Sequence, residues 1–449
     1  MRKEIAKKFL AIVVSTVMVT GLVGCGATEP AATTSPETET TEAAESDETV
    51  VEETADSGEQ VTLSFSIWSD EENYISKVVD QYNASQGNVK VELSVIPEPD
   101  YDDNLKVMLA GGTEVDIVDI RGVSQMATYA GQGALLDITD KISGDADLDT
   151  SKYGDMWSSS DVDGAYYALP TRTTCWELFY NTDLLAKAGV DTPEQMTWEE
   201  YIDYSAKVAA GLEGVTAEDG SPVYAGYWVP WIYHFNAVQS GVYANSEDTS
   251  KIQDSFELLN TLWTNGSHYS YVDVSSETYD YFSEFQNGHV ALLPNGEWVV
   301  NMLMSAKENG EPVPNWEVAP MPIPEGVEAG TSWGQFQYAA ITSTCKHPEE
   351  AYDFLSYLCG SEGAEVYAST GMIHAYSTDG AATALAEASG KESVHFLVDA
   401  QKVQEQPNAT DYQEYLNIMN ENAQLYFLGE VDIDQCMSDF KDQTAKLRK

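Results

Sequence analysis

One pattern in the sequence contains the residue types of a serine nucleophile. Residues 330–334 fit G-x-S-x-G, and three histidines downstream would serve as bases. A nucleophile elbow needs a buried strand before the serine and a helix after it. Here the Pro- and Gly-rich segment 322–330 precedes the serine and the strand-like segment 336–341 follows it. The pattern therefore does not predict a hydrolase, and we expect no catalytic residue.

A second pattern resembles half of a calcium-binding loop. Asp145, Asp147 and Asp149 match its first ligands, but Thr150 and Met156 stand at positions six and twelve, where Gly and Glu are needed. The six histidines are scattered, and no two of them are spaced as H-x-x-x-H. The sequence thus predicts neither a metal site nor a cofactor.

Aromatic residues are abundant, with 10 Trp and 26 Tyr. Flat aromatic faces stack on the C–H surfaces of sugars, and planar polar groups bind hydroxyls two at a time. Trp228 and Trp231 lie in a segment broken by Gly226 and Pro230, a context that favours ligand contact over core packing. Tryptophans in periodic or capping contexts are predicted to be structural; these are Trp176, Trp198, Trp263 and Trp316.

The charge balance excludes several partners. Against 22 Lys and Arg stand 74 Asp and Glu, a formal charge of -52 over 449 residues. Such a chain repels phosphate backbones and anionic lipid surfaces, so we expect no nucleic-acid binding. With 43% hydrophobic residues, the chain can bury one large core or two ordinary ones.

Residues 1–25 predict an export signal. A basic start precedes an apolar run, residues 9–23, that is too short for a comfortable spanning helix. The run ends at Leu22-Val23-Gly24-Cys25, which resembles the lipobox of bacterial lipoproteins. This resemblance implies that Cys25 is lipidated after cleavage and anchors the protein at the extracellular face of the cell membrane. A plain secretory signal followed by an incidental cysteine is the alternative.

Residues 26–60 predict a disordered tether. They hold 11 acids, no base and almost no large apolar side chain. Such a segment cannot bury enough surface to offset its chain entropy. The folded body should therefore begin near residue 61.

Strands and helices alternate at the start of this body. Apolar spacing predicts strands at 61–68, 89–95 and 115–120, and helices over 69–82 and 101–110. Ser69 and Glu72 form an S-x-x-E capping box at the start of the first helix, and Thr197 and Glu200 form another further along. Strand–helix–strand alternation indicates parallel strands in an open α/β sheet.

Ligands of open α/β sheets bind beyond the carboxyl ends of the strands. Trp68 and Asp70 lie at the end of the first predicted strand and just after it. Asp119 lies near the end of the third predicted strand, and Arg121 directly follows that strand. We therefore expect these four residues at the edge of a binding site.

An ordered set of motifs resembles the extracellular solute-binding proteins of ATP-driven importers, in particular the sugar-binding group that includes maltose-binding protein. The matching segments are GAYYALP (164–170), YNTDLLAKAG (180–189), TWEE (197–200), FQNGHVA (285–291), GEW (296–298), APMP (319–322) and PEEAYDFL (348–355). The resemblance covers nearly all of residues 61–449.

This resemblance implies an α/β protein of two lobes with a type II periplasmic-binding-protein-like fold, in which a multi-strand hinge lets the lobes close on a ligand. We expect 61–171 with 325–365 in the N-terminal lobe, and 172–324 with 366–449 in the C-terminal lobe. Two independent domains in series are the alternative.

The resemblance also indicates site residues. Trp298 and Trp333 match positions that commonly line the cleft, and Arg172 follows the proline of the presumed hinge, where the family often places a polar contact. With these, the predicted ligand-binding set is Trp68, Asp70, Asp119, Arg121, Arg172, Trp228, Trp231, Trp298 and Trp333.

The implied function is capture of a mono- or oligosaccharide outside the membrane and its delivery, by a monomer that catalyses no reaction, to the permease subunits of the importer. The same fold with a polyamine, peptide or iron ligand is an alternative, as are a secreted glycosidase and a non-transport adhesin. Cys175, Cys345, Cys359 and Cys436 show no decisive spacing, and we favour free, buried thiols.

Overall fold

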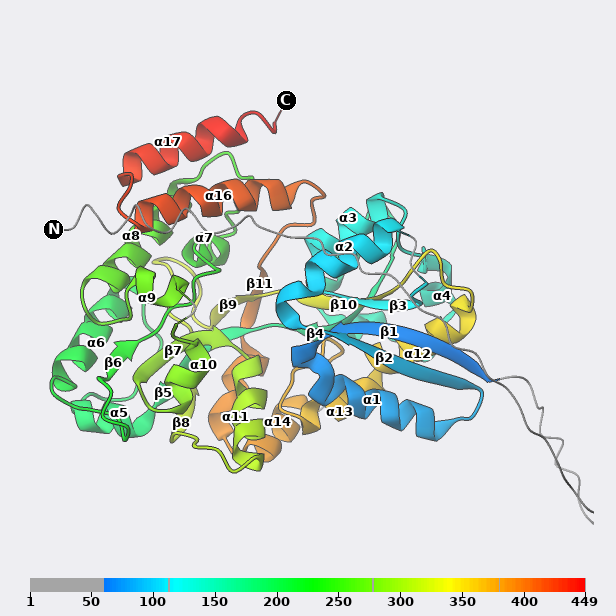
Figure 1. Ribbon diagram of the computed structural model, residues 1–449, viewed down its shortest axis with the longest axis horizontal. Coiled ribbons are helices and arrows are strands. Elements are labelled where there is room, and N and C mark those ends of the chain that lie inside the picture. Colours follow the sequence, from blue (N-terminus) through cyan, green and yellow to red (C-terminus); the bar gives the residue numbers. More distant parts are fainter. Residues whose placement is uncertain (1–59, 112–113, 277, 379, 449) are drawn as a thin grey trace, which may run out of the picture. The chain divides into compact units, whose positions relative to one another are not determined.

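The computed structural model describes residues 60–448, apart from residues 112–113, 277 and 379 (Figure 1). The predicted signal at 1–25 and the predicted tether, except Gln60, lie outside the described residues. In the part that is described, no helix has both the length and the apolar composition needed to cross a membrane.

A five-stranded sheet in the order β2-β1-β3-β10-β4 organises the first half of the fold. Its strands are β1 Val61–Trp68, β2 Val89–Ile96, β3 Ile117–Ile120, β4 Leu169–Thr173 and β10 Phe336–Ile341. β1 is parallel to both β2 and β3, which confirms the prediction from the strand–helix alternation. β10 inserts antiparallel between β3 and β4, so the complete sheet is mixed.

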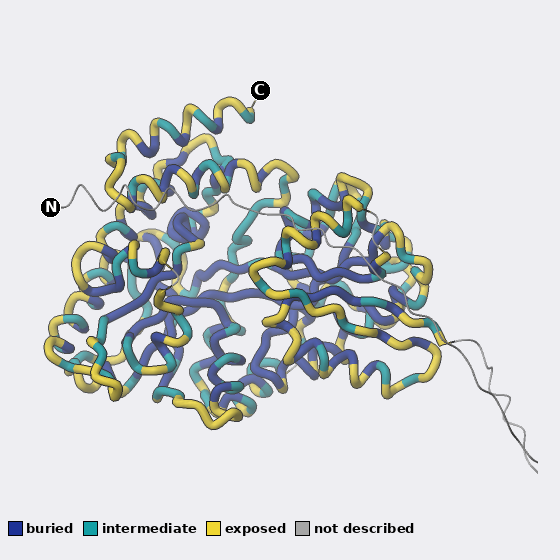
Figure 2. Tube along the Cα trace, in the orientation of Figure 1, coloured by how far each residue is buried: buried dark blue, intermediate teal, exposed yellow. Residues whose placement is uncertain are grey.

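Helices accompany this sheet and share its core. They are α1 Glu72–Ser85, α2 Tyr101–Gly111, α3 Val123–Gly131, α4 Thr139–Gly144, α12 Pro348–Cys359 and α13 Ser361–Ser369. α1 buries Tyr74, Ile75, Val78, Val79 and Tyr82, the face that its periodicity predicts. Figure 2 shows the strands as the buried centre, with exposure concentrated on the helices and loops.

The predicted capping box at Ser69 and Glu72 is wrong. Residues Ser69–Glu71 form a 3-10 turn (η1), and α1 begins at Glu72 without a side-chain cap. Ser69 Oγ instead accepts a hydrogen bond from the Glu98 amide at 3.1 Å. The reason is Glu71, which is buried and accepts a 2.6 Å hydrogen bond from the Tyr74 hydroxyl. Turning Glu71 inward tightens the backbone before the helix.

A four-stranded sheet in the order β6-β7-β5-β8 organises the second half. Its strands are β5 Trp176–Asn181, β6 Tyr224–Gly226, β7 Val290–Gly296 and β8 Trp316–Ala319. The accompanying helices are α5 Thr182–Ala188, α6 Trp198–Gly211, α7 Phe235–Gln239, α8 Ser250–Thr264, α9 Tyr271–Ser275, α10 Tyr281–Gln286, α11 Trp298–Glu308, α14 Ala381–Ser389, α15 His395–Asp399, α16 Tyr412–Phe427 and α17 Ile433–Thr444. The capping box of Thr197 and Glu200 at the start of α6 is confirmed.

Short segments connect the two sheets. Only Thr174 and Cys175 separate β4 from β5, and only Gln335 separates β9 (Thr331–Gly334) from β10. β9 pairs in parallel with β11 (Gln401–Gln404) in a two-stranded sheet. Gly334 lies so close to the β4–β5 connection that an added Cβ would stand 1.9 Å from the Thr174 carbonyl oxygen. Glycine therefore allows the two connections to touch.

Two of the expected lobe boundaries can be compared with the hydrophobic cores of the two halves. The boundary at 324/325 follows Met321 and Ile323, of which Met321 packs in the core of the second half. The boundary at 365/366 falls inside α13, whose Val366 and Tyr367 pack in the core of the first half. The first core extends to Tyr376, and Leu385 of α14 belongs to the second.

Candidate functional site

A cleft of about 650 Å³ is lined by residues from both sheets and their connections. Trp68 at the end of β1, Asp70 in η1 and Arg121 after β3 come from the first half. Trp176 in β5 and Trp298 at the start of α11 come from the second. The remaining residues that line it are Glu98, Arg172, Thr174, Trp231, Asp280, Tyr281, Met302, Gln335, Gln337 and Glu405.

Aromatic side chains form one wall of the cleft. Trp231 is 49% exposed and meets Tyr281 edge to face, with the ring centroids 5.5 Å apart. The Trp298 indole donates a 3.0 Å hydrogen bond to the Tyr281 hydroxyl, and its ring meets Trp176 edge to face at 5.3 Å. A Cβ on Gly296 would overlap the Trp298 ring at 1.9 Å, so this glycine determines where the ring lies. The wall is therefore a preformed aromatic surface with one ring open to solvent.

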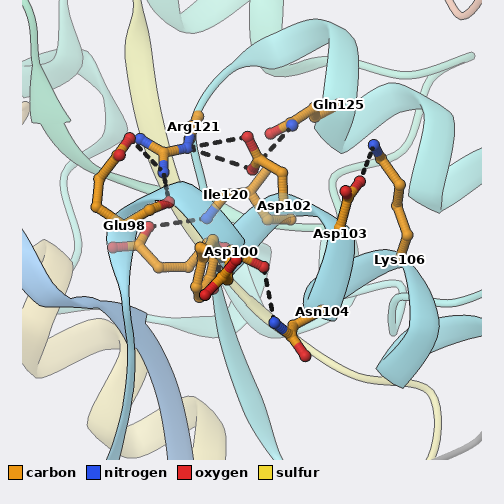
Figure 3. Close-up of polar contacts among 11 residues, drawn as sticks. Glu98, Asp100, Asp102, Asp103, Asn104, Lys106, Ile120, Arg121 and Gln125 are labelled. Carbon is orange, nitrogen blue, oxygen red and sulfur yellow. Dashed lines mark hydrogen bonds and ion pairs between the residues drawn. The ribbon is translucent and has the colours of Figure 1, made fainter. Parts of the chain in front are cut away.

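Arg121 lines the cleft from the first half, and Figure 3 shows the carboxylates that hold its guanidinium. Its guanidinium forms ion pairs with Glu98 at 3.1 Å and with Asp102 at 3.2 Å. Its Cζ lies 4.3 Å from the centroid of the Trp68 ring, a cation–π contact. Gln125 also donates a hydrogen bond to Asp102. Two carboxylates thus neutralise Arg121 before any ligand arrives.

Arg172 lies in the floor of the cleft and joins both halves. Its Nε lies 3.2 Å from Glu297 of the second half, and its Nη1 lies 3.7 Å from Glu71 of the first. Nη1 also donates a 2.8 Å hydrogen bond to Tyr74. Burial lowers the pKa of Arg172, but Tyr74 and the two carboxylates outweigh burial and raise that pKa, so the guanidinium stays charged.

The prediction that Asp119 binds ligand is not supported, because Asp119 is fully buried and does not line the cleft. Burial and the neighbouring Glu71 raise the pKa of Asp119 well above its usual range. Asp119 Oδ2 and Glu71 Oε2 are both buried without a hydrogen-bond partner among the described residues. The neutral, protonated form of Asp119 is therefore favoured.

Glu405, directly after β11, lines the cleft beside Trp176. Burial raises the pKa of Glu405 to about 7; the Trp176 side chain, which hydrogen-bonds it, opposes this shift and Glu297 adds to it. Glu405 is therefore a partly buried carboxyl group that titrates near neutral pH.

A sequence profile of the bacterial extracellular solute-binding proteins matches residues 68–365. The chain belongs to this family. The family resemblance predicted from the motifs is thereby confirmed, and so is the type II fold with its mixture of helices and several sheets.

Curated relatives of this solute-binding protein are distant. The arabinooligosaccharide-binding protein of Halalkalibacterium halodurans is 23% identical over 62% of this chain and 61% of its own length, so the chain spans about three fifths of that relative. A putative binding protein of Brucella abortus is 24% identical over 64% of this chain and 68% of its own.

Solved structures match over most of this solute-binding protein. A sugar transporter from Rhizobium etli in an open conformation is 26% identical, with a TM-score of 0.73 over 86% of this chain and 99% of that one. A substrate-binding protein from Listeria monocytogenes, solved with cycloalternan, is 18% identical, with a TM-score of 0.74 over 87% and 99%. The latter likeness shows the fold alone.

The structure brings most of the predicted site residues of this solute-binding protein together. The residues that line the one cleft are Trp68, Asp70, Arg121, Arg172, Trp231 and Trp298. Trp68 is only 3% exposed, because Arg121 covers one face of its ring and Tyr101 meets another side edge to face. Trp231 and Trp298 are accordingly the more accessible aromatic surfaces.

Trp228 and Trp333 do not line the cleft, although we expected both there. Trp228 is fully buried against Trp198 and Phe235, and its indole donates to the Ile232 carbonyl. Trp333 is fully buried in β9 and stacks on Trp176 at 5.4 Å. Nearby Gly and Pro residues break the local helix or strand, but they do not determine whether the adjacent ring packs inward.

Several cleft residues were missed by sequence reasoning. Trp176 was assigned to the core; it is 2% exposed but still contributes to the cleft floor. Gln337 lies in β10, and Glu405 directly follows β11. Their positions depend on the pairing of β10 with β4 and of β11 with β9, strands that are far apart in sequence. The one sequence feature that could have indicated Glu405 is its position directly after a strand, β11.

The structure also explains the G-x-S-x-G pattern and the resemblance to a calcium-binding loop. Ser332 is buried in β9 and its hydroxyl donates to the Trp176 carbonyl, so it is not at an exposed elbow. Asp145 accepts from the amides of Asp147 and Leu148, and Asp149 caps a 3-10 turn. Over residues 60–448, outside the gaps, no group of three or more His, Cys, Asp or Glu residues could hold a metal. The cysteines described, Cys175, Cys345, Cys359 and Cys436, are free thiols, and all except Cys345 are buried.

Proposed function

We propose that this solute-binding protein captures a carbohydrate in the cleft. The observation that carries the proposal is the aromatic wall, in which Trp231 presents an exposed ring among Trp176, Tyr281 and Trp298. A flat ring of this kind stacks on the C–H face of a pyranose or furanose. The name of one relative, an arabinooligosaccharide-binding protein, supports the same ligand class.

Tryptophan distinguishes this cleft from the other hollows of the described chain. A hollow of about 780 Å³ lies along α4 and α12, and its lining contains several acids and two tyrosines but no tryptophan. A second hollow, of about 320 Å³, is lined by tyrosine and phenylalanine rings, also without tryptophan. The cleft between the sheets is therefore the site of choice.

Delivery to a permease is the second part of the proposal. We infer that Cys25 carries a lipid, that residues 26–60 tether the body to the extracellular face of the membrane, and that a monomer passes its ligand to the permease subunits of an ABC importer. The family supports this partner. The proposed lobes are the halves built on the two sheets, divided near 171/172 and 324/325. The third division, expected at 365/366, moves to between Tyr376 and Leu385, because the core of the first half extends to Tyr376.

Closure of the lobes would provide the signal for delivery. A ligand that contacts Trp231 on one wall and Asp70 on the other gains those contacts together only when the walls approach. It therefore favours the closed arrangement by the difference in its affinity for the two states. The short connections at 174–175 and 335 are the segments that such a motion would bend.

Binding of a polyamine is a second candidate, which the acidic residues of the cleft favour. Asp70, Asp280 and Glu405 line it together with aromatic rings, and ammonium groups bind to both. A linear polyamine would, however, leave the broad aromatic wall only partly covered. Carbohydrate remains the first candidate.

A ligand screen tests the proposal. The mature chain, carrying Cys25→Ser to prevent lipidation, is melted with mono- and oligosaccharides, amino acids, polyamines and metal salts while tryptophan emission is recorded. A ligand at 100 times its dissociation constant stabilises the native state by about 2.7 kcal/mol. A saccharide that raises the melting temperature and shifts the emission supports the proposal. Stabilisation by spermidine or a peptide, with every saccharide silent, would contradict it.

A further inference from the structure

We propose that the cleft contains a subsite for a protonated amino group, so that the captured ligand is an amino sugar or an oligosaccharide that contains one. This inference rests on the proposed function and adds the charge of the ligand to it. The argument comes from which charges in the cleft already have partners.

Both cationic side chains of the cleft are already paired. Arg121 contacts Glu98 and Asp102, and Arg172 contacts Glu297 and Glu71. Each guanidinium thus faces two carboxylates. An anionic sugar would have to displace one of them, at the cost of leaving a carboxylate without its cation.

Three acids of the cleft, in contrast, have no cation. None of the ion pairs found among the described residues involves Asp70, Asp280 or Glu405. Asp70 comes from the first half and Asp280 from the start of α10 in the second, so negative charge lies on both walls. The cleft therefore has an excess of negative charge for a ligand to neutralise.

Glu405 is the most confined of the three acids. Its neighbours that titrate are Glu297, at the start of α11, and Tyr412, in α16, neither of which is a cation. Glu297 is in turn paired with Arg172. The Trp176 side chain hydrogen-bonds Glu405, and its ring meets Trp298 edge to face at 5.3 Å, so two indole rings line the cleft next to this acid. A carboxylate next to tryptophan rings is the combination that binds alkylammonium ions in water.

Binding of the amine shifts the protonation of Glu405. Without ligand, burial and the nearby Glu297 favour its neutral form. An ammonium group at contact distance favours the ionised form, so Glu405 releases its proton to solvent as the pair forms. Affinity for an amino sugar should therefore rise with pH until Glu405 is ionised, whereas affinity for a neutral sugar should change little.

Matched sugars test the inference. The pairs are glucose with glucosamine, galactose with galactosamine, mannose with mannosamine, and cellotriose with the β-1,4 trimer of glucosamine. Members of a pair differ only by a 2-hydroxyl in place of a 2-ammonium group. Calorimetry with the mature Cys25→Ser chain at pH 7.5 is expected to show at least tenfold tighter binding of the amino member in the pair that binds best.

Variants of the protein locate the subsite. Glu405→Gln should remove most of this tenfold preference by weakening binding of the amino member more than binding of the neutral member. Glu387→Gln, an exposed change on α14, should retain the preference. For the unchanged chain, affinity for the amino member should rise about fivefold between pH 6 and pH 7, where Glu405 ionises while the 2-amino group of the sugar still holds most of its proton. Melting temperatures of the variants verify that both fold.

The outcomes separate this inference from the proposed function. Neutral sugars that bind as tightly as their amino partners, or a preference that survives Glu405→Gln, would overturn the amine subsite and leave carbohydrate capture intact. Failure of every sugar, with or without an amine, would overturn the proposed function and this inference with it. Spermidine binding under that condition would identify a polyamine site.

Discussion

Trp231 is the residue on which carbohydrate capture can be tested most directly. Because its ring is 49% exposed, Trp231→Ala should change the free energy of unfolding by less than about 0.5 kcal/mol. Loss of the stacking surface should weaken sugar binding about tenfold, equivalent to about 1.4 kcal/mol. Calorimetric titration with the best ligand of the screen measures this effect.

Leu428→Ala provides the control for this experiment, since Leu428 is 51% exposed but does not line the cleft. Its affinity should equal that of the unchanged protein. If Trp231→Ala bound sugar as tightly as this control, the aromatic wall would not be the sugar-binding surface.

The two arginines of the cleft should differ in how much their loss destabilises the protein. Arg172→Met leaves Glu71 and Glu297 buried without their cation and should cost about 3–5 kcal/mol. Arg121→Met removes a partly exposed cation from exposed partners and should cost about 1 kcal/mol or less. Urea denaturation of both variants compares them. Equal losses would mean that the buried network does not stabilise the contact between the halves.

At the level of single elements, the connections between the sheets should tolerate little change. Gly334→Ala places a Cβ against the Thr174 carbonyl oxygen and should cost about 1–3 kcal/mol, because two backbone segments must separate. Gly87→Ala is the matched control, since nothing lies within 4 Å of its added Cβ. Thermal melts should show a lower melting temperature only for Gly334→Ala.

Local sequence patterns predicted the elements better than they predicted the cleft. Alternation of apolar residues found β1 and β2, and the Thr197 capping box found the start of α6, because these features depend on neighbours in sequence. The Ser69 box failed because Glu71 turns inward, where it accepts a hydrogen bond from Tyr74 and pairs with the distant Arg172.

The cleft combines residues from segments far apart in sequence, which limits prediction further. Trp68 and Arg121 could be placed because both follow strands of a parallel sheet. Glu405 could not, since its place depends on β11 pairing with β9 about seventy residues earlier. Whether Trp228 points into the core or into the cleft likewise depends on packing against Trp198 and Phe235.

For the whole molecule, buried acids predict how stability depends on pH. The pKa of Glu405 is raised from 4.5 to about 7 in the folded protein, and that of Asp119 is raised as well. Between about pH 4.5 and pH 7 the folded protein therefore binds more protons than the unfolded chain. As a result, these groups make the free energy of unfolding fall as the pH rises through this range. The contribution of Glu405 should be constant above that range.

Melting temperatures recorded without ligand from pH 4.5 to 8 measure this dependence. The double variant Glu405→Gln with Asp119→Asn should show a smaller fall in melting temperature across the interval than the unchanged chain. Glu387→Gln, on the exposed side of α14, should reproduce the original slope. Parallel curves for all three proteins would show that neither acid retains its proton on folding.

The position of β10 determines when the first sheet can be completed during synthesis. β10 lies between β3 and β4, although residues 174–335 separate it from β4 along the chain. Until the ribosome has added residue 341, β3 and β4 have no strand between them and present unpaired edges, which are prone to aggregate. The first half therefore cannot fold as a finished unit until residues 174–335, which hold most of the second half, have been made, and the nascent protein must be kept from pairing with other chains until most of its length has emerged.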